Sequence, residues 1–386
     1  MNFDLTEEQR LLVDTVASFA RKQSPLTRMR ALRADPRGWS PELWKQMGDL
    51  GLLGISMPEA VGGAGGTFAD AALILEQLAA TLVPEPFLAC LVAAAPILRL
   101  GTEEQQARWL APFAAGDASL ALAWAEAQGR FDVADVETRA VPSADGASFT
   151  LTGEKRFVLN GHAADFLVVS ARTSGAARDA SGISLFVLDK DTPGLTVRGV
   201  KTMDGHHAGM ISLQGAVVAA DRLLGPAGGA REALEEAMDL GAAGACAEGA
   251  EIARVVLHMT ADYLRTREQF GVKIGSFQAL QHRAVDMFVE AELCKSMAIL
   301  AAIRASDPDV TERQSAVSAA KVQLSAGGRQ VTQQATQLHG GIGVTDEHDV
   351  GLYFKRMQVL SALFGDEEHH VARYARLPSF TAGLEA

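Results

Sequence analysis

Residues 263 to 287 read YLRTREQFGVKIGSFQALQHRAVDM, and this stretch decides the fold. Helix-forming residues continue to about Arg267, and an amphipathic pattern starts again after Phe277. Gly271 and Gly275 lie between the two patterns, as glycines do where a helix is interrupted. The stretch therefore predicts the end of one helix, a break and the start of another.

Arg267 lies at this break, with Phe270 and Gln278 close to it in sequence. A guanidinium suits a pyrophosphate, because its charge is fixed and its donors are forked. An arginine at a helix C-terminus can also simply satisfy the helix dipole. From the residues alone, the second interpretation is the simpler one.

The helical period extends over the C-terminal part of the chain, from Pro226 to about Arg376. Apolar residues repeat there at the spacing of bundle helices, as in the series Phe277, Leu280, Ala284, Met287, Ala291 and Cys294. The pattern predicts a helical bundle over residues 226–386.

Residues 117–225 have a different character, with short apolar runs of strand type. The runs include 148–151, 166–169 and 183–188, and the turn residues between them include 144–146, 160–161 and 192–194. This segment predicts a small β domain. Residues 1–116 again show helical spacing, with a capping box formed by Thr6 and Gln9. The expected fold is α+β and mainly α, with domains 1–116, 117–225 and 226–386.

Composition excludes several classes of protein. The 386 residues include 35 Lys and Arg against 47 Asp and Glu, which gives a net charge of -12. A nucleic-acid partner is not expected, because phosphates require basic patches. No apolar run is long enough to span a bilayer, and Met1 to Asp4 do not start a secretion signal. Three scattered cysteines predict buried thiols in a reducing, cytoplasmic compartment.

Metal and nucleotide motifs are equally sparse. The sequence contains no phosphate loop, and the glycines at 62–66 lack Rossmann spacing. Glu367-x-x-His370 corresponds to half of a di-iron motif, but a second Glu-x-x-His pair is missing from the sequence. We therefore expect no metal site, and a solvated helix start at Glu367.

The chain resembles the acyl-CoA dehydrogenase family. Arg-x-x-Phe-Gly at Arg267–Gly271, followed by Phe277-Gln278, is similar to the family's signature around the flavin pyrophosphate. Other segments resemble the family's motifs in the family's order, namely TEEQR at 6–10, the glycine-rich turn at 51–66, GEKRF at 153–157 and QLHGGIG at 337–343.

The resemblance implies an N-terminal helical domain, a middle β-barrel-like domain and a C-terminal four-helix bundle. It implies FAD as cofactor and an acyl-CoA thioester as substrate. A carboxylate would remove the α proton, while the β hydrogen would leave as hydride. The residues it assigns to FAD are Arg267, Gln269, Phe270, Gln278, Gln337, Gly340, Gly341 and Phe157.

The chain departs from the family where the flavin ring and the base belong. Residues 125–132 read AEAQGRFD in place of Thr-Glu-Pro-x-x-Gly-Ser-Asp, and 157–159 lack the family's hydroxyl. Counting from Arg356 places Gly365 at the usual base position, and an alternative base position falls on Gly241. Neither residue is a carboxylate.

In the family's dimers, each subunit lends Arg-x-x-Phe-Gly and Gln-x-x-Gly-Gly to its neighbour's FAD. These lent elements are intact here, so the pattern predicts one subunit of a heteromer, a heterotetramer with a paralogous large subunit. The chain is most similar to the small-subunit branch exemplified by the pimeloyl-CoA dehydrogenase small subunit. An acceptor like electron-transfer flavoprotein would take the electrons.

Two alternatives remain open at this point. One is a self-sufficient homotetramer with Asp366 as the base, one residue beyond the expected place. Glu248 and Glu251 are weaker candidates for that role, and ion pairing is the simpler account of both. The other alternative is a structural subunit that has no flavin of its own.

Overall fold

The computed structural model describes residues 4–381, which form two compact units. The helical unit consists of residues 4–30, 68–83 and 242–381, and the sheet unit consists of residues 31–67 and 84–241. Helix α7 (Arg231–Thr266) begins in the sheet unit and continues into the helical unit. The two units cut across the order of the chain, and the division at residues 116 and 225 stays a prediction.

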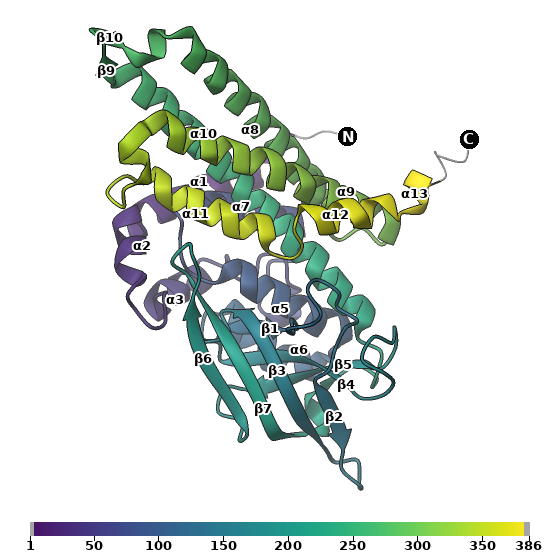
Figure 1. The fold of residues 1–386 in the computed structure, drawn as a ribbon. Coiled ribbons are helices and arrows are strands. Elements are labelled where there is room, and N and C mark those ends of the chain that lie inside the picture. Colours follow the sequence, from purple (N-terminus) through teal and green to yellow (C-terminus); the bar gives the residue numbers. More distant parts are fainter. Residues whose placement is uncertain (1–3, 382–386) are drawn as a thin grey trace. The chain divides into compact units, whose positions relative to one another are not determined.

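The helical unit contains the long helices drawn in the green and yellow part of Figure 1. Besides most of α7, its helices are α1 (Glu7–Gln23), α4 (Phe68–Ala79), α8 (Gln278–Arg304), α9 (Val310–Gln323), α10 (Arg329–His339), α11 (Val350–Ala362), α12 (Glu367–Ala375) and α13 (Pro378–Thr381). Short pieces join them: strands β9 (Glu268–Gln269) and β10 (Val272–Lys273), 3-10 turns at Ile274–Ser276 and Gly340–Val344, and a π-helical turn at Leu324–Gly328.

Helix α1 starts as the sequence predicts. The Thr6 hydroxyl accepts a hydrogen bond from the Gln9 backbone, and the Gln9 side chain accepts one from the Thr6 backbone. Gln9 then donates its amide to Asp70 of α4 at 2.9 Å. The capping box therefore fixes both the start of α1 and its contact with α4.

Helix α8 packs against α9 and α10. Its buried residues are Met287, Ala291, Cys294, Ala298, Ala301 and Ala302, so the predicted apolar period is confirmed from Met287 onward. Phe277 differs, since it precedes the helix and is 38% exposed. The apolar period therefore identifies the buried face of α8 from Met287 onward. Phe277, at the break before the helix, is not part of that face.

The sheet unit is built on an eight-stranded sheet with the order β6-β7-β3-β2-β4-β5-β8, and β1 pairs in parallel with β4. Figure 1 shows β6, β7, β3 and β2 side by side. The strands are β1 (Leu120–Ala123), β2 (Arg139–Pro142), β3 (Ser148–Leu159), β4 (Phe166–Arg172), β5 (Ile183–Asp189), β6 (Leu195–Lys201), β7 (His207–Ala219) and β8 (Leu223–Leu224). The order of helices, β domain and helices is confirmed.

Predicted turns lie between these strands. Gly146, Asn160 and Gly194 all have positive φ, of 70°, 58° and 85°. Glycine and asparagine are the residues that adopt this conformation most readily. Turn chemistry in the sequence therefore marked where the strands end.

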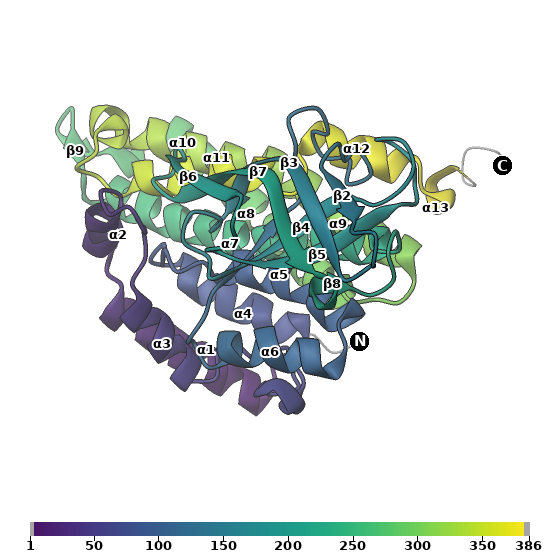
Figure 2. The same cartoon turned by 90° about the horizontal axis from the view of Figure 1, so that it is seen from below.

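Helices cover part of the sheet unit. Helix α5 (Phe87–Leu100) packs on β1 and on α6 (Glu103–Ala114); Figure 1 labels the three elements close together, and Figure 2 shows α5 and α6 from below. The remaining helical pieces are α2 (Leu26–Leu32), which crosses from the helical unit into the sheet unit, α3 (Pro41–Asp49), and 3-10 turns at Glu59–Val61 and Ala220–Arg222. Helix α3 buries Trp44, whose indole donates to the Ala118 carbonyl at 3.0 Å.

The three cysteines are buried and unpaired, as expected, and burial raises the thiol pKa of Cys90, Cys246 and Cys294. Within residues 4–381, none of the helices combines the length and the hydropathy that crossing a bilayer requires. Because they are buried and have raised pKa values, the three thiols are packing groups within the two units.

The sheet core makes a testable contribution to stability. Val187 of β5 is fully buried, whereas Val217 of β7 is 56% exposed. We expect Val187→Ala to lower the free energy of unfolding by about 2 kcal/mol, since it removes buried methyl groups and leaves a cavity. The same change at Val217 should cost less than about 0.5 kcal/mol.

All four tryptophans, at positions 39, 44, 109 and 124, lie in the sheet unit, so urea unfolding followed by tryptophan fluorescence reports on this unit. Equal losses from the two valine variants would contradict the assignment of the core.

Candidate functional site

The break predicted around Arg267 is a β-hairpin. Helix α7 ends at Thr266, and β9 and β10 pair Gln269 with Val272. Phe270 and Gly271 form the two-residue turn, with φ of 55° and 80°. Positive φ at both turn positions is the geometry that a tight hairpin requires, and it is strained for phenylalanine. The Phe270 side chain is 92% exposed.

The last carbonyl of α7 is satisfied without the Arg267 side chain. Lys273 of β10 donates its ammonium to the Thr266 carbonyl at 3.1 Å, and it also pairs with Glu268 at 2.6 Å. The exposed Arg267 guanidinium makes no hydrogen bond or ion pair with any residue of 4–381. The Arg267 guanidinium therefore does not cap α7 by a hydrogen bond, and its place directly after Thr266 still lets its charge complement the helix dipole.

Gln278 begins α8, directly after Phe277. The Phe270 and Phe277 rings meet edge to face with centroids 6.2 Å apart, which joins the hairpin tip to the start of α8. The exposed Gln278 side chain has no hydrogen bond within the described residues, whereas Gln269 donates to the neighbouring Glu268 carbonyl. Arg267, Phe270 and Gln278 thus present free groups from one short region.

The second predicted segment lies where α10 ends. Gln337 is exposed on its last turn, and Gly340 has φ 65° and ψ -141°. Beyond the adjoining residues, no atom of the described chain lies within 4 Å of where a Cβ on Gly340 or Gly341 would be. Backbone conformation requires glycine at position 340, and the open space at both positions leaves room for another molecule to approach.

Phe157 belongs to the sheet unit, whereas the other predicted FAD residues all belong to the helical unit. It sits in a β-bulge of β3 with φ 50°, is 63% exposed and donates its N–H to the Met210 sulfur at 3.4 Å. A surface pocket of about 450 Å³ beside this bulge is lined by residues of β3, β6 and β7, among them Arg156 and Arg198.

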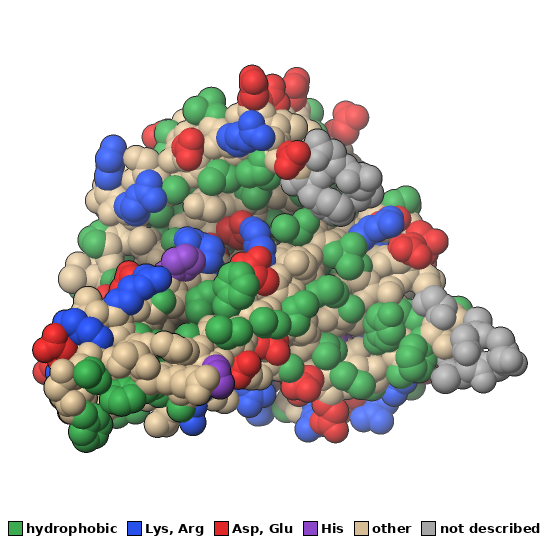
Figure 3. Space-filling view, turned by 90° about the horizontal axis from the view of Figure 1, so that it is seen from above, with side chains coloured by type: hydrophobic (Ala, Val, Ile, Leu, Met, Phe, Trp, Pro, Cys, Tyr) green, Lys and Arg blue, Asp and Glu red, His purple; other side chains and the backbone are tan. Residues whose placement is uncertain are grey.

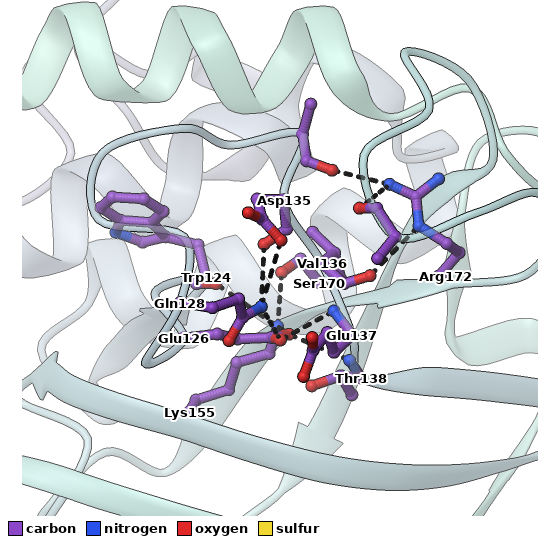
Figure 4. A network of polar contacts seen from close by, with 12 residues as sticks. Trp124, Glu126, Gln128, Asp135, Val136, Glu137, Thr138, Lys155, Ser170 and Arg172 are labelled. Atoms are coloured by element: carbon purple, nitrogen blue, oxygen red, sulfur yellow. Dashed lines mark hydrogen bonds and ion pairs between the residues drawn. The ribbon is translucent and has the colours of Figure 1, made fainter.

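The loop that departs from the family contains an ion pair that the sequence reasoning missed. Glu126 and Lys155 are paired at 2.6 Å with almost no exposure, and Figure 4 shows the network around them. The Glu126 carboxylate also accepts hydrogen bonds from the backbone of Glu137 and Thr138. The signal in the sequence was the phase of Lys155, which lies four residues after the buried Leu151 on the same face of β3.

The energetics of this pair fix its charges. Burial alone would raise the pKa of Glu126, but the Lys155 ammonium and the hydrogen bonds outweigh it and lower that pKa to about 2. Burial also lowers the pKa of Lys155 to about 8. Breaking such a pair costs about 3–5 kcal/mol, since one charge is left buried alone. Glu126 is therefore a structural carboxylate that holds the loop.

The position that the resemblance assigns to the base has no room for a side chain. Gly365 has φ 119°, and a Cβ there would lie 2.4 Å from Nε2 of His370. His370 is 1% exposed; its Nε2 donates to the Phe364 carbonyl at 3.1 Å, and its Nδ1 lies 3.3 Å from the Ser318 hydroxyl. His370 therefore belongs to the packing of this loop, and the expected solvated helix start applies only to the exposed Glu367.

The residues before this loop are also fixed. Lys321 is fully buried and donates to the Leu360 carbonyl at 2.6 Å and the Ser361 carbonyl at 3.3 Å. Ser325 donates to the Ser361 carbonyl at 3.1 Å. These donors satisfy the carbonyl end of α11, so the chain enters the Gly365 loop from a rigid position.

The three candidate carboxylates have structural partners. Asp366 is the N-cap of α12 and accepts from the His369 backbone at 2.9 Å. Asp366 and Arg329 are both among the residues that line a pocket of about 260 Å³. Glu248 pairs with Arg356 at 2.6 Å, and Glu251 pairs with Arg254 at 2.5 Å. Capping and ion pairing are the roles that the structure shows for these groups.

The closed position at 365 gives a first prediction for this site. We expect Gly365→Ala to lower the free energy of unfolding by about 2–4 kcal/mol, because it adds backbone strain and a collision with His370. Gly351→Ala in α11 is the matched control, since its new Cβ would meet ordinary contacts at 3.6 and 3.7 Å. Urea unfolding followed by far-UV circular dichroism measures both, and equal stabilities would refute the closed position.

The buried histidine gives a second prediction. Burial, followed by the charges of Lys321, His369 and Arg373, lowers the pKa of His370 from 6.5 to about 2. The unfolded chain takes up this proton below pH 6.5 and the folded chain does not. This contribution to stability is thus complete above pH 6.5 and is lost as the pH falls toward 2, by at most about 1.4 kcal/mol per pH unit.

The measurement is the free energy of unfolding between pH 7 and pH 5. His370→Gln keeps an amide donor for the Phe364 carbonyl and removes the titrating ring. Its slope against pH should be shallower than that of the parent chain, and identical slopes would show that His370 titrates normally.

Comparison with known proteins agrees with this architecture. The models described as acyl-CoA dehydrogenase N-terminal, middle and C-terminal domains match residues 6–117, 121–216 and 228–377. The probable acyl-CoA dehydrogenase YngJ of Bacillus subtilis (strain 168) is 32% identical over 362 residues, which cover 91% of this chain and 92% of that protein.

Two solved structures are similar over nearly the whole chain. A variant of the steroid ACAD Tcur3481-Tcur3483 is 31% identical with a TM-score of 0.86, covering 98% of this chain and 99% of that one. The ChsE4-ChsE5 complex from Mycobacterium tuberculosis is 26% identical with a TM-score of 0.86, covering 97% and 98%. Fold, domain order and sequence identity agree over the full length, and the chain therefore belongs to the acyl-CoA dehydrogenase family, whose members are FAD-using oxidoreductases acting on acyl-CoA.

Proposed function

We propose that the chain serves FAD-dependent α,β-dehydrogenation of an acyl-CoA as one subunit of a heteromeric enzyme. In this proposal it lends Arg267–Gly271 and Gln337–Gly341 to a FAD whose ring and base lie in a partner subunit. The observation that carries the proposal is a contrast within the helical unit. The side chains of Arg267, Gln278 and Gln337 make no hydrogen bond within residues 4–381, whereas the position assigned to the chain's own base is closed.

The residues on the lending side fit a dinucleotide cofactor. The Arg267 guanidinium, which has no partner among residues 4–381, can form paired, charge-assisted hydrogen bonds to a pyrophosphate. The exposed Phe270 ring offers a flat apolar surface, and the open backbone at Gly340 and Gly341 allows close approach. FAD, when bound, supplies the acceptor for the hydride that leaves the β carbon.

Removal of the α proton needs a carboxylate with a free oxygen near the substrate. Gly365 provides none, Glu248 and Glu251 are held in ion pairs, and Asp366 caps α12. These contacts favour a base supplied by another chain. They count against the homotetramer that relies on Asp366, although the second oxygen of Asp366 keeps that alternative testable.

A partner of the same fold is supported by α8, which is apolar on two sides. Opposite its buried face, six large apolar side chains are between 38 and 59% exposed: Val285, Phe288, Val289, Leu293, Leu300 and Ile303. A helix that is apolar all round is normally buried. Figure 3, the view from the side on which Figure 1 draws α8, shows hydrophobic side chains at the surface between charged ones.

The related structures indicate what to test first. One is the ChsE4-ChsE5 complex, and another is a variant of the steroid ACAD Tcur3481-Tcur3483. We propose that the partner is a paralogous large subunit, that steroid side-chain thioesters are the first substrates to assay, and that a cytoplasmic flavoprotein accepts the electrons.

Co-expression with a neighbouring acyl-CoA dehydrogenase paralogue tests the proposal. The chain alone should purify colourless and inactive, and the complex should contain FAD and turn over acyl-CoA. Arg267→Ala in the complex should weaken FAD binding about 10- to 100-fold, the loss of a strong charge-assisted contact. Arg265→Ala is the matched control, because Arg265 pairs with Asp262 on the same helix, and it should bind FAD normally.

Two results would overturn the proposal. The first is a chain that binds FAD tightly and turns over by itself, with activity abolished by Asp366→Asn. The second is a complex in which Arg267→Ala retains full affinity for FAD. The second result, in a complex that turns over acyl-CoA, would instead support a structural subunit that has no flavin of its own.

A further inference from the structure

His339 is a buried histidine with one nitrogen unused. It is the last residue of α10, directly before Gly340, and is 2% exposed. Its Nδ1 lies 2.7 Å from the Ala335 carbonyl, which can only accept, so Nδ1 carries the proton. Its Nε2 is buried without a hydrogen-bond partner among residues 4–381. A buried unpaired nitrogen calls for an explanation.

Two aromatic rings pack against this imidazole. Tyr263 of α7 stacks on it with centroids 4.5 Å apart and planes at 28°, and His348 lies 4.5 Å away at 52°. The Val350 backbone donates to Nδ1 of His348 at 3.2 Å, which ties this ring to the start of α11. The three rings, called the aromatic stack below, join α7, α10 and the segment before α11.

The aromatic stack lies between the two segments assigned to FAD. The Tyr263 carbonyl accepts from the Arg267 backbone at 2.9 Å, so the tyrosine is one helical turn before the arginine. At the other end His339 is adjacent to Gly340. No hydrogen bond or ion pair joins residues 263–281 to residues 335–345 in the described chain. The stacking of Tyr263 on His339 is thus the contact of defined geometry that joins the Arg267 segment to the Gln337–Gly341 segment.

We propose that His339 is a positioning residue, whose stacking on Tyr263 fixes the spacing between Arg267 and the Gln337–Gly341 turn for FAD binding. The inference rests on the proposed function of these two segments. It goes further by assigning a role to a residue that need not touch the cofactor.

The stack also makes the link sensitive to acid. Burial, and then His348, lowers the pKa of His339 below its usual 6.5, while the bond to Ala335 opposes this. The titratable groups packed on the ring are Tyr263 and His348, and no described carboxylate forms an ion pair with it. A second proton would occupy Nε2, where it has no acceptor, so the neutral ring supports the stack above pH 6.5 and protonation disrupts it as the pH falls.

The test uses the FAD-containing complex. His339→Ala should weaken FAD binding about tenfold with an unchanged turnover per bound FAD, measured by FAD fluorescence and by kcat. His339→Phe keeps a ring without a titrating nitrogen, so its affinity at pH 8 should lie within about threefold of the parent. FAD release should accelerate between pH 7 and pH 5.5 in the parent and stay constant in His339→Phe.

His258 provides the control. It makes the same bond to a carbonyl four residues earlier, Nδ1 to Arg254 O at 2.7 Å, but it is exposed. His258→Ala should change neither FAD affinity nor its pH dependence. If His339→Ala prevents assembly, the pH profile of His339→Phe still decides.

Three results separate the two proposals. Normal FAD affinity in His339→Ala overturns the positioning role. So does a His339→Phe variant whose FAD release accelerates at low pH as much as that of the parent. Weaker binding in Arg267→Ala alone leaves the proposed function standing without it. If neither variant alters FAD binding, the proposed function fails as well.

Discussion

The His370 ring occupies the space in which a side chain at position 365 would begin. The ring cannot move aside easily, since it is buried and contacts both the Phe364 carbonyl and the Ser318 hydroxyl. Lys321 and Ser325 donate hydrogen bonds to the last carbonyls of α11, the helix that precedes this loop. Only glycine fits the resulting loop, because the backbone has positive φ and a Cβ would collide with the ring. The lack of a side chain at position 365 is thus a property of packing, because a larger residue there would meet the His370 ring.

The rest of the helical unit has the opposite character at its hairpin end. Lys273 satisfies the last carbonyl of α7, which leaves the neighbouring Arg267 without a partner in the described chain. Phe270 is held in a strained turn and exposed to solvent. The strained turn costs free energy and exposes a phenylalanine next to an arginine without an ion-pair partner among the described residues. Such a surface is typical of a site that contacts another molecule. Closed base position and open hairpin together favour a subunit that completes a site elsewhere.

Buried charges stabilise the loops in both units. Glu126 and Lys155 fix the loop after β1, and Lys321 fixes the end of α11. Each buried ammonium has oxygen partners, without which its desolvation would be too costly. In the sheet unit, the pairing with Lys155 keeps Glu126 ionised and uses its oxygens. The glutamate that this loop shares with the family's motif therefore stabilises the loop.

The sequence by itself determined the order of helices, strands and helices, because apolar periodicity and turn residues are local signals. It also identified the capping box at Thr6, the turns at Gly146 and Gly194, and the residues that carry the family resemblance. The buried pair of Glu126 with Lys155 was not predicted, since 29 residues separate the partners and only the fold brings them together. Whether Arg267 caps its own helix depended on where Lys273 lies after the hairpin turn. Whether position 365 can hold a base depended on a histidine five residues later, whose ring reaches back into the loop. Contacts of this kind arise from packing in three dimensions, and the tertiary structure alone decided them.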